Sequence, residues 1–93
     1  MNGLNEIIRN PETRLIDVRT PAEVNEIGVD RAENIPMDQV PQRLDEFKEM
    51  KGDIVLFCRS GARSDRVMQF LKQNGMNNVH NAGGYSDVKM HLM

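Results

Sequence analysis

The only cysteine of the chain, Cys58, stands between an apolar run and a short polar loop. That loop carries two arginines and leads into a segment with helical spacing; its residues are Arg59, Ser60, Gly61, Ala62, Arg63 and Ser64. Unpaired backbone N–H groups at the start of a helix favour an anion, and arginine charge adds to this effect. Both effects lower the pKa of a thiol. The loop therefore predicts a nucleophilic thiolate at Cys58.

Two simpler interpretations apply to the same residues. A lone cysteine taken at random is most often a small buried hydrophobe. Arginines such as Arg59 and Arg63 are solvated surface residues in most loops. Glycine and small residues here let the backbone crowd the sulfur, which is typical of reactive thiols. We therefore expect the two arginines to bind an anionic substrate beside Cys58.

Length and composition limit the kind of molecule that carries this loop. A chain of 93 residues favours a single domain over residues 1–93, and 39% apolar with 28% charged residues is ordinary for a globular protein. A net charge of −2 argues against nucleic acid or an acidic membrane as partner. One cysteine excludes an internal disulfide, and no leader or long apolar span is visible. The cytoplasm is therefore the expected compartment, or the periplasm if a leader has been removed.

Strand and helix patterns alternate along the chain. Short apolar or branched runs predict strands at residues 15–18 and 54–58, a strand of two or three residues within 33–37, and a last short strand followed by a glycine turn over 77–84. Apolar spacing predicts helices at residues 4–10, 21–28, 38–51 and 64–73, with Gly52 just beyond the third, and a weak terminal helix at 86–93. Thr20 and Glu23 have the spacing of a capping box at the second helix.

This alternation indicates an α/β fold with a small, mainly parallel central sheet and helices on both faces, because parallel neighbours need crossover connections. The run from Ile54 to Cys58 has no polar alternation, as expected of a strand buried on both faces. Ligands gather at the carboxyl ends of such strands, which is where Cys58 stands.

Four motifs together resemble the rhodanese family of sulfurtransferases, in particular the small single-domain bacterial rhodaneses of the phage-shock type. They read "LIDVRTPAE", "ENIP", "CRSGARS" and "NAGGYSDV", in that order. The resemblance implies one rhodanese-like domain with a three-layer fold. It also implies transfer of a sulfane sulfur from a donor such as thiosulfate to a thiophilic acceptor, cyanide or a small or protein thiol, through a Cys58 persulfide. Residues 59–64 would cradle that sulfur. No cofactor and no metal is implied, and a monomer is expected.

The resemblance also assigns Asp17 and Arg19 to an ion pair or hydrogen-bonding support of the active loop. The chain departs from the family pattern before "NIP", where Gly28 takes the usual histidine place and Arg31 the usual glycine place. These departures predict a reshaped turn at residues 28–31. Near the late Gly-Gly, Tyr85 and Val88 stand where a tryptophan is common.

Other functions remain as alternatives. Cysteine phosphatases place five residues between Cys and Arg, whereas four separate Cys58 from Arg63, a smaller cradle that suits one sulfur atom. A binding module that carries a persulfide or senses redox state through Cys58 would need no turnover. His80 and His91 are far apart and have no second ligand at metal-binding spacing, so we expect no metal site.

Overall fold

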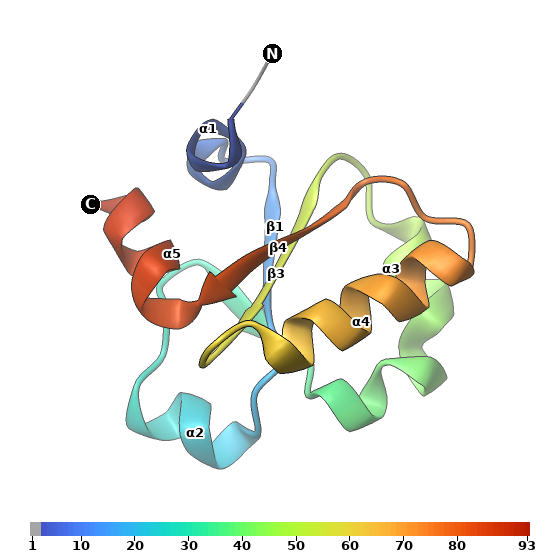
Figure 1. The fold of residues 1–93 in the computed structure, drawn as a ribbon, viewed down its shortest axis with the longest axis horizontal. Coiled ribbons are helices and arrows are strands. Elements are labelled where there is room, and N and C mark those ends of the chain that lie inside the picture. The colour runs from blue at the N-terminus through green and yellow to red at the C-terminus, as the bar shows by residue number, and fades with distance from the viewer. Residues whose placement is uncertain (1–2) are drawn as a thin grey trace.

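The computed structural model describes residues 3–93, and these form one parallel sheet covered by helices (Figure 1). The strand order is β2-β1-β3-β4, and each neighbouring pair is parallel. The strands are β1 (Arg14–Asp17), β2 (Ala32–Asn34), β3 (Ile54–Cys58) and β4 (Val79–Gly84). The α-helices are α1 (Leu4–Arg9), α2 (Pro21–Glu26), α3 (Leu44–Glu49), α4 (Ala62–Gln73) and α5 (Tyr85–Leu92). The predicted α/β fold with a parallel sheet is confirmed.

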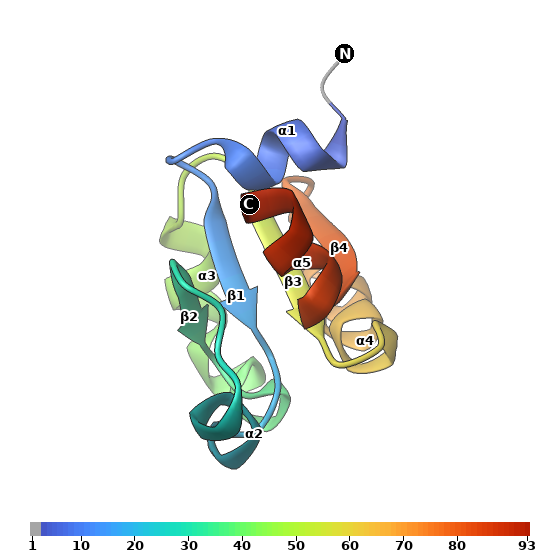
Figure 2. The same ribbon diagram turned by 90° about the vertical axis from the view of Figure 1, so that its left-hand side faces the viewer.

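Both faces of the sheet are buried, and β1 and β3 show why. Successive side chains of a strand point to opposite faces. Ile16 and Leu56 pack in a core with residues of α3 and α4, whereas Leu15 and Val55 pack in a second core with residues of α1 and α5. Figure 2 shows α1 and α5 on one side of the sheet and α3 and α4 on the other. The predicted three layers are therefore present.

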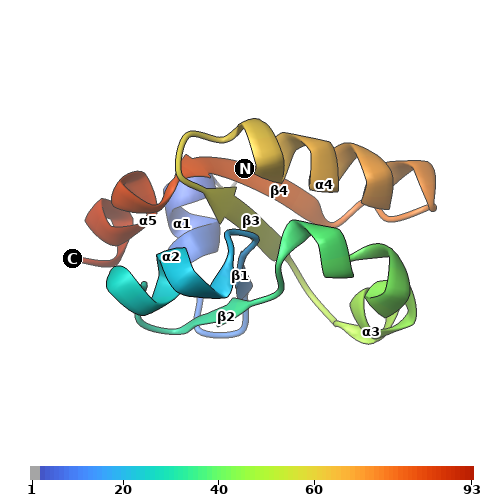
Figure 3. The same ribbon diagram turned by 90° about the horizontal axis from the view of Figure 1, so that it is seen from below.

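One end of the sheet collects the segments that matter for chemistry. β1 and β3 end there, α2 follows β1, and the turn after β3 leads into α4 (Figures 2 and 3). Because parallel strands share direction, residues far apart in sequence meet at this edge. Cys58 is the last residue of β3, as the apolar run predicted.

The predicted helix at residues 38–51 is wrong in its extent. The structure has two 3-10 turns, η1 (Met37–Gln39) and η2 (Pro41–Arg43), before the short α3. Pro41 has no N–H to donate, which removes one bond of an α-helical ladder. The turns are closed instead by hydrogen bonds from the Val40 N–H to the Met37 carbonyl oxygen and from the Arg43 N–H to the Val40 carbonyl oxygen.

Other boundaries differ by one to three residues. The strand of two or three residues predicted within 33–37 has three residues but lies at Ala32–Asn34; Pro36, which cannot donate to the ladder, lies beyond it. The strand at 15–18 lies at Arg14–Asp17, and the helix expected from Ser64 begins at Ala62. The weak terminal helix is confirmed as α5. Across residues 3–93, none of the helices combines the length and apolarity needed to cross a membrane.

In the turn before β2, a residue other than glycine adopts the left-handed backbone conformation. Arg31, at the usual glycine place, has φ of 73°, a conformation uncommon for side-chain-bearing residues. Its guanidinium donates to the carbonyl oxygens of Ile8 (3.1 Å) and Asn10 (3.0 Å). The arginine therefore ties this turn to the end of α1.

Candidate active site

Cys58 lies at the carboxyl end of β3, and only 1% of its surface is exposed. Its sulfur accepts a hydrogen bond from the Gly61 N–H at 3.0 Å. The Ser64 hydroxyl lies 3.5 Å from the same sulfur. The residues after the cysteine therefore turn back over it before α4 begins, as Figure 1 shows for the loop between β3 and α4.

Opposing effects set the pKa of the Cys58 thiol. Burial raises the pKa, but hydrogen bonds from the Ser64 hydroxyl and from the backbone of Ser64, Ser60 and Gly61 lower it to about 7. A thiol with this pKa is about half ionised at neutral pH, against about 3% for a free thiol. The predicted activation of Cys58 by its loop thus has a physical basis in the described contacts.

The loop packs backbone to backbone against the end of β4. Gly61 adopts a left-handed φ of 99°, and a Cβ there would lie 3.1 Å from the Cα of Gly83. A Cβ on Gly84 would lie 2.6 Å from the Arg59 carbonyl oxygen, a distance that real structures do not tolerate. The two glycines of β4 therefore let the loop approach closely enough to curl around the sulfur.

Asn81 on β4 makes two hydrogen bonds to the loop and a third within β4. Its Nδ2 donates to the Gly61 carbonyl at 3.1 Å, and its Oδ1 accepts from the Ser64 hydroxyl at 2.7 Å. The same Oδ1 accepts from the Gly83 N–H at 3.0 Å. Sequence reasoning did not single out Asn81, although it directly precedes the "AGG" of a recognised motif.

The predicted ion pair of Asp17 and Arg19 is confirmed and buried. Arg19 Nη2 lies 2.7 Å from Asp17 Oδ2, and the two side chains are 4% and 2% exposed. Arg19 Nη2 also donates to the Ile27 carbonyl at 2.7 Å, and its guanidinium lies 4.4 Å from the Tyr85 ring centroid. The pair therefore joins the end of β1 to the residue after α2 and to the start of α5.

The predicted substrate-binding arginine Arg63 has a partner within the chain. Its Nη1 and Nη2 donate to the two carboxylate oxygens of Glu23, at 2.6 and 2.9 Å. About a third of each side chain is exposed. Glu23 was expected only as a capping residue of α2, and that capping box with Thr20 is confirmed. No sequence signal connects two residues 40 positions apart.

The remaining loop residues face outward. Arg59, Ser60 and Ala62 are exposed, while Gly61 and Ser64 are buried. Ser60 contributes through its backbone to the lowered pKa of Cys58. The structure thus brings Cys58, Gly61 and Ser64 into contact and leaves the Arg59 side chain at the surface.

Two clefts adjoin this loop. One, of about 240 Å³, is lined by Arg19, Glu23, Glu26, Ile27, Arg59 and Tyr85. The other, of about 230 Å³, is lined by Val18, Thr20, Pro36, Met37, Asp38 and Arg63. Glu23 lines the first cleft and Arg63 the second, so their ion pair stands between the two.

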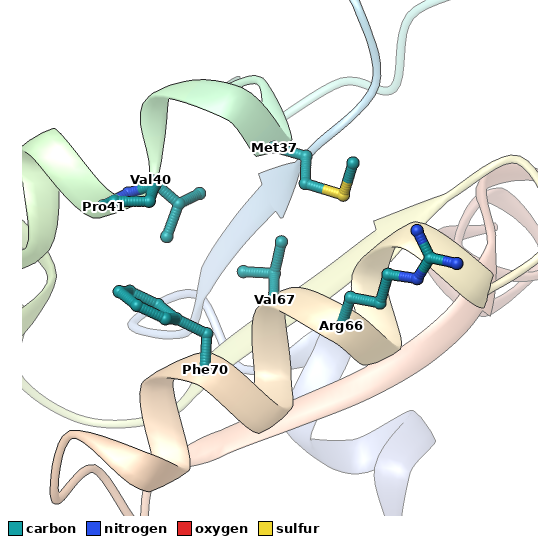
Figure 4. A pocket seen from close by; sticks show the side chains of 6 residues that line it. All are labelled: Met37, Val40, Pro41, Arg66, Val67 and Phe70. Carbon is teal, nitrogen blue, oxygen red and sulfur yellow. The ribbon is translucent and has the colours of Figure 1, made fainter.

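A further cleft of about 180 Å³ lies between α4 and the 3-10 turns (Figure 4). Arg66 is its one charged lining residue, and Val67, Phe70 and three residues of the turns region supply apolar surface. It contains no nucleophile. Within residues 3–93, no three His, Cys, Asp or Glu side chains are grouped as a metal site, and His80 lies 2.9 Å from Asp53.

Comparison with known proteins gives consistent matches. The model of the rhodanese-like domain family matches residues 2–91. A sulfurtransferase of Allochromatium vinosum is 40% identical over 70 residues, which cover 75% of this chain and 64% of that relative. The chain thus spans less than two thirds of that relative's length. Thiosulfate sulfurtransferase PspE of Escherichia coli is 36% identical over 76 residues, covering 81% of this chain and 73% of PspE.

A solved structure agrees with these matches. The structure described as rhodanese with anions from E. coli superposes with a TM-score of 0.72 at 32% identity. The superposition covers 81% of this chain and 89% of that one.

Proposed function

The chain belongs to the rhodanese-like sulfurtransferase family, and from this premise we propose that it moves a sulfane sulfur through a persulfide on Cys58. The donor is a small molecule such as thiosulfate, and the acceptor is a thiophile, either cyanide or a thiol. The observation that carries the proposal is the Cys58 sulfur held 3.0 Å from the Gly61 N–H at the start of α4.

The first half of the reaction uses the thiolate as nucleophile. Cys58 attacks the outer sulfur of thiosulfate, an S–S bond to the cysteine forms, and the original S–S bond breaks. Sulfite leaves with the electron pair of that bond, and Cys58 retains a terminal, anionic sulfur. Both sides carry a total charge of −3, so no separate oxidant or reductant is needed.

The second half regenerates the thiolate. A thiophile attacks the terminal sulfur, and the cysteine sulfur leaves as thiolate. With cyanide the product is thiocyanate. Backbone N–H groups aimed at the sulfur stabilise negative charge on both the thiolate and the persulfide. They do so without rearrangement, because Asn81 and the glycines of β4 hold the loop in place.

Intact-mass spectrometry tests the proposal directly. Incubation with thiosulfate should add one sulfur, about 32 Da, and cyanide should remove it and yield thiocyanate, as expected for covalent catalysis. Cys58→Ser should take up no sulfur. If the wild-type protein transfers no sulfur from any of several donors, it acts as a binding module and the proposal is wrong.

A parallel assay addresses phosphatase chemistry on the same loop. Four residues separate Cys58 from Arg63, and the loop is closed by Gly61 over the sulfur. We therefore expect no hydrolysis of aryl phosphates under conditions that turn over thiosulfate. Aryl phosphatase activity that Cys58→Ser abolishes would contradict this expectation.

A further inference from the structure

The ion pair between Glu23 and Arg63 places a carboxylate on the loop's second arginine. Both oxygens of Glu23 are engaged by the guanidinium, at 2.6 and 2.9 Å. This parallel two-bond geometry is the strong form of an arginine–carboxylate contact. An anion that approaches Arg63 on this side must displace the carboxylate or accept its repulsion.

Glu23 is held in this place from a second direction. Its Oε1 also accepts from the Thr20 N–H and the Thr20 hydroxyl, both at 3.1 Å. Hydrogen bonds from Arg63 and then Thr20 lower the pKa of Glu23 to about 2, so the carboxylate is ionised at neutral pH. The capping box of α2 therefore aims a fixed negative charge at the loop arginine.

The other charges near the loop do not offset this carboxylate. Arg19 is neutralised by Asp17 at 2.7 Å. Glu26 lines the same cleft as Glu23, where Arg59 supplies positive charge. Positive and negative side chains are thus close to balanced at the mouth of the site. Because Glu23 occupies the Arg63 guanidinium, that arginine is not free to bind an anion.

We propose that Glu23 is a specificity-determining residue that disfavours doubly charged sulfur donors relative to singly charged ones by occupying Arg63. The proposal rests on the sulfur transfer at Cys58 proposed above and refines its donor class. The favoured donors are those that carry the sulfane sulfur on a group with at most one negative charge.

A matched pair of donors isolates this effect. Thiosulfate carries two negative charges, whereas methanethiosulfonate has a methyl group in place of one charged oxygen and carries one. The Cys58 thiolate attacks the outer sulfur of either donor, so both form the same persulfide. Sulfite leaves from the first and methanesulfinate from the second, each with the electron pair of the broken S–S bond.

Glu23→Gln is the test variant, because glutamine keeps one oxygen for the Thr20 capping contacts but loses the charge and one of the two oxygens that accept from Arg63. Cyanide serves as acceptor, and kcat/KM is measured for each donor. We expect the ratio of kcat/KM for thiosulfate to that for methanethiosulfonate to rise about tenfold, the scale of a charge-assisted contact. An unchanged ratio, or equal losses for both donors, would overturn the proposal.

Two further variants separate the mechanism from a general charge effect. Glu33→Gln removes the same charge from another two-bond pair, with Arg14 at 2.6 and 2.8 Å, at the opposite end of β1. It should leave the donor ratio unchanged. In an Arg63→Gln background, Glu23→Gln should raise the ratio of kcat/KM for thiosulfate to that for methanethiosulfonate much less than in the wild type, because the two effects are coupled. Full gain without Arg63 would overturn the proposal.

A second readout does not depend on sulfur transfer. Iodoacetate and iodoacetamide alkylate the same thiolate and differ by one negative charge. Glu23→Gln should raise the ratio of the iodoacetate rate to the iodoacetamide rate at Cys58 severalfold, and Glu33→Gln should leave that ratio unchanged. If neither donor yields a persulfide but this ratio rises, the proposed function fails while the role of Glu23 in charge selection stands. An unchanged alkylation ratio would contradict that role.

Discussion

The Cys58 thiol shows how hydrogen bonds outweigh burial at one residue. Desolvation alone would keep the thiol protonated. The hydrogen bonds from Ser64, Ser60 and Gly61 bring its pKa down to about 7. The Ser64 hydroxyl has a single proton, which also reaches Asn81 Oδ1 at 2.7 Å. The backbone N–H groups therefore provide the part of the stabilisation that no competing acceptor removes.

Ser64→Ala should raise the pKa of Cys58 from about 7 towards the free-thiol value of about 8.5. The hydroxyl stabilises the thiolate, so its loss favours the protonated form. A lost contact of about 1 kcal/mol should lower the iodoacetamide alkylation rate at pH 6.5 about fourfold. The measurement is the rate of alkylation as a function of pH.

Ser60→Ala is the matched control for this experiment. It removes a hydroxyl from the same loop but keeps the Ser60 backbone N–H, through which that residue acts on the pKa of Cys58. Its pH profile should coincide with that of the wild type. If both variants shift equally, the Ser64 hydroxyl has no special part in lowering the pKa.

At this scale the sequence singled out Cys58 and its loop but not the distant residues that contact the loop. Cys58 and its loop are contiguous, so an apolar run, a glycine and two arginines were visible together. Glu23 and Asn81 reach the loop only because parallel strands and their connections converge at one edge. Contacts between residues 20 or 40 positions apart leave no mark in local spacing.

At the scale of elements, the end of β4 and the loop before α4 behave as one packed unit. Gly84 has an ordinary φ of −94°, so a side chain there meets no conformational penalty. The obstacle is the Arg59 carbonyl oxygen, 2.6 Å from where a Cβ would lie. Closeness between backbones, rather than flexibility, is what requires glycine here.

Gly84→Ala should therefore push the loop away from β4 and lower both stability and sulfur transfer. Forcing a methyl into a packed site typically costs about 1–3 kcal/mol. Chemical denaturation measures the free energy of unfolding, and kcat/KM for any sulfur donor reports how far displacement of the loop lowers sulfur transfer. Gly28→Ala is the control, since its Cβ would lie 3.3 Å from the Val24 carbonyl oxygen, a much milder contact than the 2.6 Å at Gly84. A Gly84→Ala protein as stable and active as Gly28→Ala would contradict this account.

The elements themselves were predicted unevenly, for physical reasons. β3 was found because a strand buried on both faces has an uninterrupted apolar run. The segment before α3 was misassigned because Val40, Leu44 and Phe47 keep helical spacing even though Pro41 breaks the ladder. The predicted position of β2 was inaccurate because its three residues, Ala32–Asn34, contain too little apolar pattern to locate a strand.

For the whole molecule, the Cys58 thiolate links folding to pH. The folded pKa of about 7 lies below the free-thiol value of about 8.5. The stabilisation is therefore complete above the unfolded value and is lost as pH falls through the folded one. We expect the free energy of unfolding to rise by about 2 kcal/mol between pH 6.5 and 9.

Cys58→Ser isolates this contribution from the other groups that titrate in the same range. The difference in unfolding free energy between wild type and variant, measured with a reductant present, should grow with pH across that interval. A difference that does not change with pH would mean that the thiolate gains nothing from the fold, contrary to the described hydrogen bonds.

Apart from the Ser64 hydroxyl, the groups that donate hydrogen bonds to the Cys58 sulfur are main-chain N–H groups. The adjoining cleft is lined instead by side chains, among them those of α2, the loop and α5. Mutation exchanges side chains but leaves main-chain amides in place, except where proline is introduced. The hydrogen bonds to the Cys58 sulfur are therefore preserved in most point substitutions, whereas the side chains that line the cleft are not. Copies of this scaffold can diverge in donor preference through a few changes in the cleft lining and inherit the same thiolate chemistry, which makes Glu23 and Arg59 the natural positions for redesign.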